Sequence, residues 1–406
     1  MADFDVITEQ GDLEALARDL LREEIIAVDT EADSFYHYYD KTCLVQIATK
    51  KHAWLIDPLA LDGPAELAPL GAVFSSPDVR KVFHAGEYDL FVLKRDCGFT
   101  FANLFDTMIS AQLLGYPAIG LAALIEHHFG TRLPKDEQRS DWSRRPLTER
   151  QLEYAVSDVL YLIRLSDKLG RELEKAGRLG WAEAEFAALT RREWPEREFD
   201  RLGYLRIKGA RELDPTQLAV LRELFLLRDA RAREIDRPPF KVLANRALLD
   251  IARSCPADSN SLGRTKGVTE LIVRRMGSDI LEAVAKGTHK PHGPIPKLGG
   301  TVVRRRMDRR TERRLARLKS WRAPRAKELG LDPGVLCANA SLEAIAFAHP
   351  ESKRDLTEIV GVKAWFAESF GDEVLACLEE TAGAPSEEKP PTTATAPTRR
   401  RRRRRR

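Results

Sequence analysis

The stretch Ile25-Ile26-Ala27-Val28-Asp29-Thr30-Glu31 decides both the fold and the chemistry expected of this chain. Its apolar start, rich in Ile and Val, is typical of a buried β-strand. Side chains two residues apart in a strand point to the same face, so Asp29 and Glu31 should stand side by side at the strand's end. Two carboxylates at that distance repel each other and favour a cation between them. On its own the pattern also fits a turn or a helix cap, so further carboxylates are needed to define a metal site.

The composition indicates a multidomain protein with ordinary hydrophobic cores. The chain has 406 residues, 43% of them hydrophobic, which is enough for two or three domains. No stretch approaches the roughly 18 apolar residues of a membrane span, and the acidic N-terminus has no apolar signal core. The five cysteines are far apart and form no Cys-x-x-Cys pair, so neither a zinc site nor a disulfide framework is expected. We therefore expect a cytoplasmic protein that does not enter the membrane.

The net charge of +4 hides an asymmetry along the chain. Residues 1–200 carry 23 basic and 36 acidic side chains, whereas residues 201–398 carry 35 basic and 26 acidic ones. The last eight residues, 399–406, are all arginine. This division favours a carboxylate-based site in the front half and binding of a polyanion by the back half.

The front half alternates between strand and helix patterns. A hairpin of two strands follows the opening strand, with Thr49-Lys50-Lys51-His52 as its turn. Asp12 is the expected N-cap of the first helix, and Thr148 with Gln151 predicts a capping box that opens one long helix to about residue 176. The other expected elements are strands at 43–48, 53–57 and 79–85 and helices at 12–24, 87–96, 106–114 and 120–129. A hairpin followed by strand–helix alternation predicts a mixed α/β domain.

From about residue 213 the chain is helical and repeats itself at a fixed offset. A shift of 94 residues without a gap pairs Pro239 with Pro333 and Asn245 with Asn339. The same shift pairs further glycines, prolines and apolar residues: Leu248 with Leu342, Ile251 with Ile345, Pro256 with Pro350, Gly267 with Gly361, and Gly277 with Gly371. One shift that matches turn residues and core residues together indicates two copies of a small helical domain.

Two further segments supply acidic residues in distinctive places. The run His84-Ala85-Gly86-Glu87-Tyr88-Asp89 puts Asp89 just inside a helix that follows a strand. Tyr154 and Asp158 are four residues apart in a predicted helix and therefore share one face. Taken singly, Asp89 fits a first-turn acid favoured by the helix dipole, and Tyr154 fits a packed helical residue.

Together these segments resemble the three exonuclease motifs of the DEDD superfamily, in its tyrosine subgroup. The matching residues are Asp29-x-Glu31, Asp89 within His-x-x-x-x-Asp-Leu, and Tyr154-x-x-x-Asp158. The duplicated domain resembles the HRDC module, and the whole layout over about residues 1–380 resembles the ribonuclease D family. Three short stretches of sequence also resemble that family: Leu44-Val45-Gln46-Ile47, Leu55-Ile56-Asp57-Pro58 and the run Asp141 to Thr148.

The resemblance implies a ribonuclease H-like α/β domain and a site for two Mg²⁺ or Mn²⁺ ions. Two divalent ions about 3.5–4 Å apart can both activate water and stabilise the departing 3′ oxygen. The family implies that Asp29, Glu31 and Asp158 hold the ion that activates water, that Asp29 bridges to the second ion, and that Asp89 helps through water. Tyr154 would orient the attacking water, because its pKa near 10 makes it a poor base.

The implied activity is 3′→5′ removal of nucleoside 5′-monophosphates from RNA, with trimming of tRNA precursors as the task. Structured RNA with a free 3′ end is the expected partner, and no obligate protein partner is expected. Two other functions remain open: a 3′→5′ DNA exonuclease with the same site, and a catalytically silent RNA-binding scaffold. Asp106 is more readily explained as a helix N-cap, and His84 fits a structural histidine as well as a substrate contact.

The predicted organisation has six parts. They are an exonuclease domain at 1–176, a connecting helix and linker at 177–212, an HRDC-like domain at 213–287, a linker at 288–312, a second HRDC-like domain at 313–381, and a disordered tail at 382–406. The segment from Arg304 to Lys327 carries twelve Lys or Arg and two acids and is interpreted as a phosphate-contacting surface. The polyarginine tail is interpreted as a polyanion tether.

Overall fold

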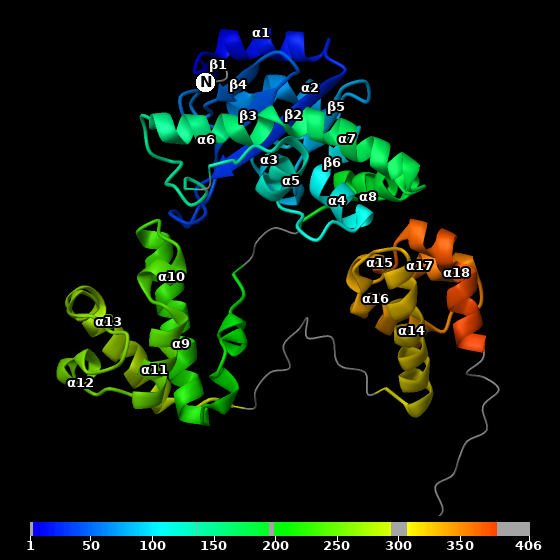
Figure 1. The fold of residues 1–406 in the computed structure, drawn as a ribbon. Coiled ribbons are helices and arrows are strands. Elements are labelled where there is room, and N and C mark those ends of the chain that lie inside the picture. Colours follow the sequence, from blue (N-terminus) through cyan, green and yellow to red (C-terminus); the bar gives the residue numbers. More distant parts are fainter. Residues whose placement is uncertain (1–2, 135, 195–198, 294–306, 380–406) are drawn as a thin grey trace, which may run out of the picture. The chain divides into compact units, whose positions relative to one another are not determined.

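The computed structural model describes residues 3–134, 136–194, 199–293 and 307–379. An α/β domain comes first, and all the later elements are helical (Figure 1). This confirms the predicted fold class. Most of the predicted linker at 288–312 and all of the predicted tail at 382–406 lie outside the described residues. What was expected of these two segments therefore stays a prediction. In the described part of the chain, no helix combines the length and the apolar character needed to span a bilayer.

The α/β domain is built on one mixed sheet, in the order β1-β4-β3-β2-β5-β6 within the described residues. Strand β2 is central: it runs antiparallel to β3 and parallel to β5. The strands are β1 (Phe4–Ile7), β2 (Ile25–Ala32), β3 (Thr42–Ala48), β4 (Ala53–Ile56), β5 (Arg80–Phe83) and β6 (Leu104–Asp106). The β3–β4 hairpin was predicted, whereas the short outer strands β1 and β6 were not.

Helices cover the sheet and close its core. Helix α6 packs on β2, β3 and β4, and α7 packs on β2 and β5 (Figure 1). The helices of this domain are α1 (Gln10–Leu20), α2 (Gly71–Ser75), α3 (Glu87–Cys97), α4 (Thr107–Leu114), α5 (Leu121–Phe129), α6 (Glu149–Leu160), α7 (Leu162–Lys175) and α8 (Leu179–Arg191), with the 3₁₀ segment η1 (Pro64–Leu70). The predicted N-cap Asp12 is wrong, because α1 begins at Gln10 and Asp12 lies in its first turn without capping it.

The single long helix predicted from Thr148 to about residue 176 is also wrong. The backbone N–H of Tyr161 turns to the carbonyl of Val159, which interrupts the helical hydrogen-bond ladder between α6 and α7. After the break, α7 packs on β5 as well as on β2. Helix α8 was expected to be only a connection, but it packs on β6, where Phe186 and Phe105 have ring centroids 4.9 Å apart.

The two helical repeats share the same internal construction. The first contains η2 (Gly203–Arg206), η3 (Ala210–Glu212), α9 (Pro215–Glu234), α10 (Pro239–Val242), α11 (Asn245–Ser254), α12 (Ser259–Gly263) and α13 (Glu270–His289). The second contains α14 (Arg309–Glu328), α15 (Pro333–Leu336), α16 (Asn339–Ala348), α17 (Lys353–Glu358) and α18 (Ala364–Glu379). Helices α10 and α15, like α11 and α16, begin and end at positions 94 residues apart, as the sequence shift predicts.

Equivalent residues even adopt equivalent backbone and side-chain geometry. Cys255 and His349 end their helices in the left-handed region, at φ 42° and 49°. The buried guanidinium of Arg228 donates to the Leu243 carbonyl and, over 2.7 Å, to Asn245 Oδ1. In the second repeat Arg322 makes the same pair of bonds, to the Cys337 carbonyl and to the Asn339 side chain. The repeated arginine therefore ties each long helix to the turn before the next one.

Candidate active site

Strand β2 presents Asp29 and Glu31 on one face of the sheet. Asp29 lies opposite Gln46 of β3, and Glu31 lies opposite Leu44. The register shifts just after Glu31, so regular pairing ends at the site. A bulge of this kind frequently redirects side chains next to an active site. The first motif is thus held by the interior strand of the sheet, which restricts its movement.

The turn between β5 and α3 sets the position of Asp89, which lies in the first turn of α3. The Asp106 carboxylate accepts hydrogen bonds from the backbone N–H groups of Ala85 and Gly86, at 3.3 and 2.8 Å. The same carboxylate accepts from the N–H groups that open α4, which confirms the predicted N-cap. Gly86 has no room for a side chain, because a Cβ there would lie 2.7 Å from the Phe83 Cβ. The turn before α3 is therefore set by one buried carboxylate and one close contact.

Helix α6 carries the third motif. Thr148 and Gln151 form the predicted capping box, with both reciprocal hydrogen bonds present. Tyr154 and Asp158 follow on one face of this helix, and Tyr154 is buried. Because α6 packs on β2 and β3, that face meets the sheet where Asp29 and Glu31 stand.

The three segments converge as the motifs suggest. Carboxylate oxygens of Asp29, Glu31 and Asp158 all lie within 4.8 Å of one another. Asp89 is not part of this tight group; its Oδ1 accepts a 2.6 Å hydrogen bond from the Thr30 hydroxyl. The structure therefore brings four acidic residues from β2, α3 and α6 to one place.

The pKa shifts show how strongly these acids interact. Burial, and then the nearby charges of Asp89 and Asp158, raise the pKa of Asp29 well above its usual range. Burial and the same two carboxylates raise the pKa of Glu31. Burial raises the pKa of Asp89 to about 6 and that of Asp158 to about 7. The common cause is that charged carboxylates have been removed from water and placed side by side.

The donor set fits a divalent cation. Among the described residues, no Lys, Arg or His side chain forms an ion pair with any of these four acids. Buried carboxylates without a cationic side chain are unfavourable unless they are protonated or coordinate a metal. Hard oxygen ligands of this type suit Mg²⁺ or Mn²⁺.

Tyr154 lies at the edge of this cluster with a hydroxyl that stays protonated. Burial, followed by the Asp158, Glu31 and Asp29 carboxylates, raises its pKa further above the usual value. Its ring packs against the buried Trp142, with centroids 6.1 Å apart. A tyrosine held in this way is a hydrogen-bonding group rather than a base.

Sequence reasoning missed Thr30, whose role depends on strand geometry. The side chain of Thr30 points away from Asp29 and Glu31 and meets Asp89 there. The available signal was the polar residue between the two acids. His84, by contrast, takes the structural alternative: its Nδ1 lies 2.9 Å from the Thr107 hydroxyl, and burial lowers its pKa to about 4.

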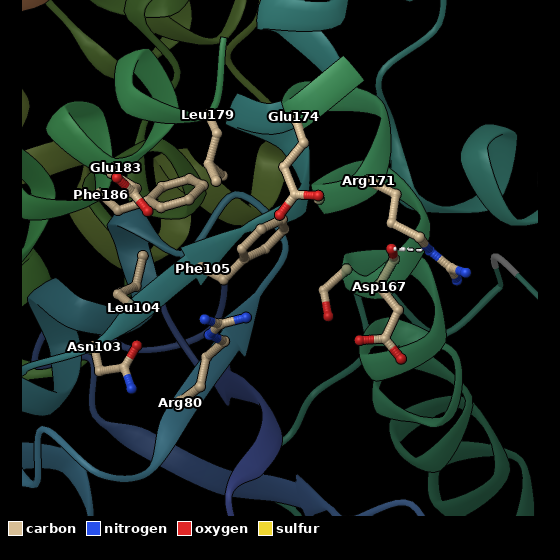
Figure 2. Close-up of a pocket in the computed structure, with 12 residues that line it drawn as sticks. Arg80, Asn103, Leu104, Phe105, Asp167, Arg171, Glu174, Leu179, Glu183 and Phe186 are labelled. Atoms are coloured by element: carbon tan, nitrogen blue, oxygen red, sulfur yellow. Dashed lines mark hydrogen bonds between the residues drawn. The ribbon is translucent and has the colours of Figure 1, made fainter. Parts of the chain in front are cut away.

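A separate hollow of about 520 Å³ lies at the β6 edge of the sheet, away from the acidic cluster. Phe105 and Phe186 give it apolar surface, and Arg80, Glu174 and Glu183 also line it (Figure 2). None of the four clustered acids lines this hollow. It is therefore distinct from the candidate active site.

Comparison with known proteins gives the class that the fold and site define. A family model described as 3′-5′ exonuclease matches residues 4–174, and the HRDC domain model matches residues 217–284 and again 311–378. The chain is thus a 3′→5′ exonuclease followed by two HRDC domains. A Ribonuclease D from Gluconacetobacter diazotrophicus is 33% identical, over 91% of this chain and 92% of that protein. The chain belongs to the ribonuclease D family, and it is a 3′→5′ exoribonuclease.

Other relatives give the same picture. A Ribonuclease D from Pseudomonas paraeruginosa is 31% identical, over 92% of this chain and 97% of that one. The crystal structure of Escherichia coli RNase D, an exoribonuclease involved in structured RNA processing, has a TM-score of 0.66 at 28% identity and covers 93% of this chain and 99% of that chain. The catalytic core of RRP6 from Trypanosoma brucei has a TM-score of 0.65 at 31% identity, covering 71% of this chain and 80% of its own.

Proposed function

We propose that this exoribonuclease trims the 3′ ends of tRNA precursors by metal-dependent hydrolysis and releases nucleoside 5′-monophosphates. The observation that carries the proposal is the half-buried cluster of Asp29, Glu31 and Asp158, which has no cationic side chain paired with it among the described residues. The involvement of the Escherichia coli relative in structured RNA processing supports RNA with folded regions as the substrate. Two HRDC domains with a basic segment supply surfaces for the phosphate backbone.

Asp29, Glu31 and Asp158 would hold divalent cations, with Asp89 contributing from its own position. When bound, two Mg²⁺ or Mn²⁺ ions would supply an activated water and charge stabilisation for the departing 3′ oxygen. The protein's part is to keep the acidic groups in a fixed arrangement. The sheet holds Asp29 and Glu31, the capped helix α6 holds Asp158, and Thr30 orients Asp89.

Tyr154 would orient the attacking water through its hydroxyl. Its raised pKa means that the hydroxyl keeps its proton at neutral pH and can donate and accept hydrogen bonds. Because Asp158 lies one helical turn further along α6, the tyrosine hydroxyl and the carboxylate would be able to contact the same water. We assign Asp29, Glu31, Asp89, Tyr154 and Asp158 as the catalytic residues on this basis.

The test is a digestion of precursor tRNA and of a matched single-stranded DNA, labelled so that both the shortened chain and the released nucleotide are seen. With Mg²⁺ or Mn²⁺ we expect stepwise shortening of the RNA from its 3′ end and labelled nucleoside 5′-monophosphate. Asp29→Asn should abolish hydrolysis while the protein stays folded. Asp19→Asn, which changes an exposed acid on α1, is the matched control and should keep full activity.

Each part of the proposal has its own contrary result. Preferred digestion of the DNA would identify a DNA exonuclease instead. RNA binding without any released nucleotide would indicate a silent scaffold. Full hydrolysis by Asp29→Asn would remove the carboxylate cluster from the mechanism.

A further inference from the structure

We propose that the buried amide of Gln46 is a positioning residue for Asp29 and holds its carboxylate in place when a divalent cation is bound. The inference rests on the proposed function, because it concerns how the metal-binding cluster is kept in order. It assigns a role to a residue that lies outside the three exonuclease motifs.

The sheet register places the two side chains together. Gln46 of β3 lies directly opposite Asp29 of β2 in the antiparallel pair. Residues opposite each other in such a pair have Cα atoms about 4.5–5.5 Å apart and side chains on the same face. The Gln46 amide therefore lies on the face that carries Asp29 and Glu31, beneath α6.

Gln46 is an anomaly within its strand. Every residue of β3 is buried, and Gln46 is 0% exposed. Within the described residues neither its Nε2 nor its Oε1 has a hydrogen-bond partner. An amide buried in this way is unfavourable for folding by itself, because it has given up its bonds to water. A leucine or methionine would fill the same space without that cost, so the amide calls for a partner that folding alone does not provide.

Among its neighbours in the adjoining strands, Asp29 is the partner available to Gln46. On the other side, β4 places the apolar Leu55 opposite Gln46. Asp57, two residues beyond Leu55, is already engaged, since its carboxylate accepts from Arg145 Nε and Nη2 at 2.5 and 2.6 Å. Asp29 is not bound by any cationic side chain of the described residues. A carboxylate that binds a cation with one oxygen has further lone pairs to accept an amide N–H.

Such a contact has a clear chemical use. Hydrogen bonds from outside the ligand set fix the orientation of metal-binding carboxylates, and their loss typically weakens metal binding by about 10–100-fold. An amide suits this task better than a lysine or arginine, because it donates a hydrogen bond without competing with the cation for the negative charge. It also keeps the same protonation state across the working pH range.

The decisive experiment compares Gln46→Met with Leu55→Met in the full-length protein. Methionine has a similar volume and no hydrogen-bond donor, and Leu55 lies on the same sheet face but beyond Gln46. Mn²⁺ affinity is measured by titration calorimetry without RNA, and thermal unfolding is measured in the metal-free protein. Gln46→Leu serves as a second variant with the same readouts.

We expect Gln46→Met to bind Mn²⁺ at least about tenfold more weakly. Its metal-free unfolding temperature should be equal to or higher than that of the unmodified protein, and Leu55→Met should keep the original Mn²⁺ affinity. Mn²⁺ affinity within twofold of the original in both Gln46 variants overturns the role, as does an equal loss in Leu55→Met. If the unmodified protein neither binds Mn²⁺ nor cleaves RNA, the proposed function fails instead, which separates the two ideas.

Discussion

The hydroxyl of Thr30 donates a 2.6 Å hydrogen bond to the carboxylate of Asp89. This bond joins the central strand to helix α3 at the candidate active site. Thr30 lies between two clustered acids in sequence but points to the other face of the sheet. One strand therefore supplies two acidic residues on one face and orients a third from the other.

Thr30→Val should separate orientation of Asp89 from folding. Valine keeps the shape of threonine but removes the donor, so the unfolding free energy should fall by about 1–2 kcal/mol. We expect hydrolysis to slow by about tenfold, because a misplaced group in an active site costs rate. Single-turnover rates and denaturant unfolding measure the two effects.

Thr42→Val provides the matched control for that experiment. The Thr42 hydroxyl donates over 2.8 Å to Asp96 near the other end of α3 and, within the described residues, makes no hydrogen bond to the clustered acids. This variant should lose similar stability without losing rate. Equal slowing in both variants would mean that α3 as a whole, and not Asp89, accounts for the effect.

Asp158→Asn should stabilise the metal-free protein at high pH. The pKa of Asp158 is about 7 in the folded protein, above the value of about 4 expected in the unfolded chain. A raised folded-state pKa means that the carboxyl favours folding while protonated. Its contribution is fully present below pH about 4 and is lost as the pH rises through about 7.

Thermal unfolding in the presence of a chelator at pH 5 and pH 8 tests whether the stability contributed by Asp158 falls as the pH rises. The asparagine side chain at position 158 does not titrate. The unfolding temperature of the variant, relative to that of the unmodified protein, should therefore rise between pH 5 and pH 8. With Mn²⁺ present at pH 8 the order should reverse, since a charged carboxylate binds the ion more tightly than a neutral amide. A constant difference across the pH range would contradict the assignment of a strained, metal-binding carboxylate.

Tyr154→Phe should slow hydrolysis by on the order of 100-fold while leaving Mn²⁺ affinity unchanged. The hydroxyl is proposed to orient water and not to bind the ion, so the rate of hydrolysis should fall while the Mn²⁺ affinity stays the same. The pKa of Tyr154 is raised, so the pH–rate profile should show no limb from its ionisation near pH 10. Tyr116→Phe, which removes a hydroxyl bonded to Glu172 at 2.7 Å, should keep the full rate. A matching loss of Mn²⁺ affinity in Tyr154→Phe would place the tyrosine among the ligands.

The basic helix α14 should contribute to RNA affinity in proportion to the phosphates it contacts. Replacing the exposed Arg309, Arg310 and Arg313 by glutamine should weaken RNA binding. The slope of log affinity against log salt should become shallower by roughly 0.7–0.9 for each lost phosphate contact. Replacing the exposed Arg22, Lys50 and Lys51 of the exonuclease domain removes the same charge and should have a smaller effect. Equal slopes for the two triple variants would show that net charge alone matters.

Local rules predicted the features that depend on neighbouring residues. Thr148 and Gln151 form the expected capping box, and Asp106 caps α4, because each bond spans only two or three residues. Rules of the same kind failed at Asp12, because the helix begins at Gln10 with Glu9 at the N-cap position and no side-chain capping bond. The break at Tyr161 was not predictable, since the apolar pattern continues across it.

The site was predictable in its members but not in its connections. The order and spacing of Asp29, Glu31, Asp89 and the Tyr154–Asp158 pair identified the candidates. Their convergence depends on β2 lying in the sheet interior beneath α6, which spacing cannot reveal. The support from Thr30 and from Asp106 was invisible for the same reason, because each bond joins elements far apart in the chain.

The paired arginines Arg228 and Arg322 have a consequence for how the two repeats could diverge. Each arginine stabilises its repeat through bonds between its own helices. The residues on the outward faces are therefore less constrained by the fold. Helix α9 carries four arginines and three acids, whereas its counterpart α14 carries nine basic residues and two acids. An ancestral duplication that preserved the internal frame would leave one copy free to gain positive charge. The second repeat therefore combines the shared internal frame with a more basic surface on its long helix.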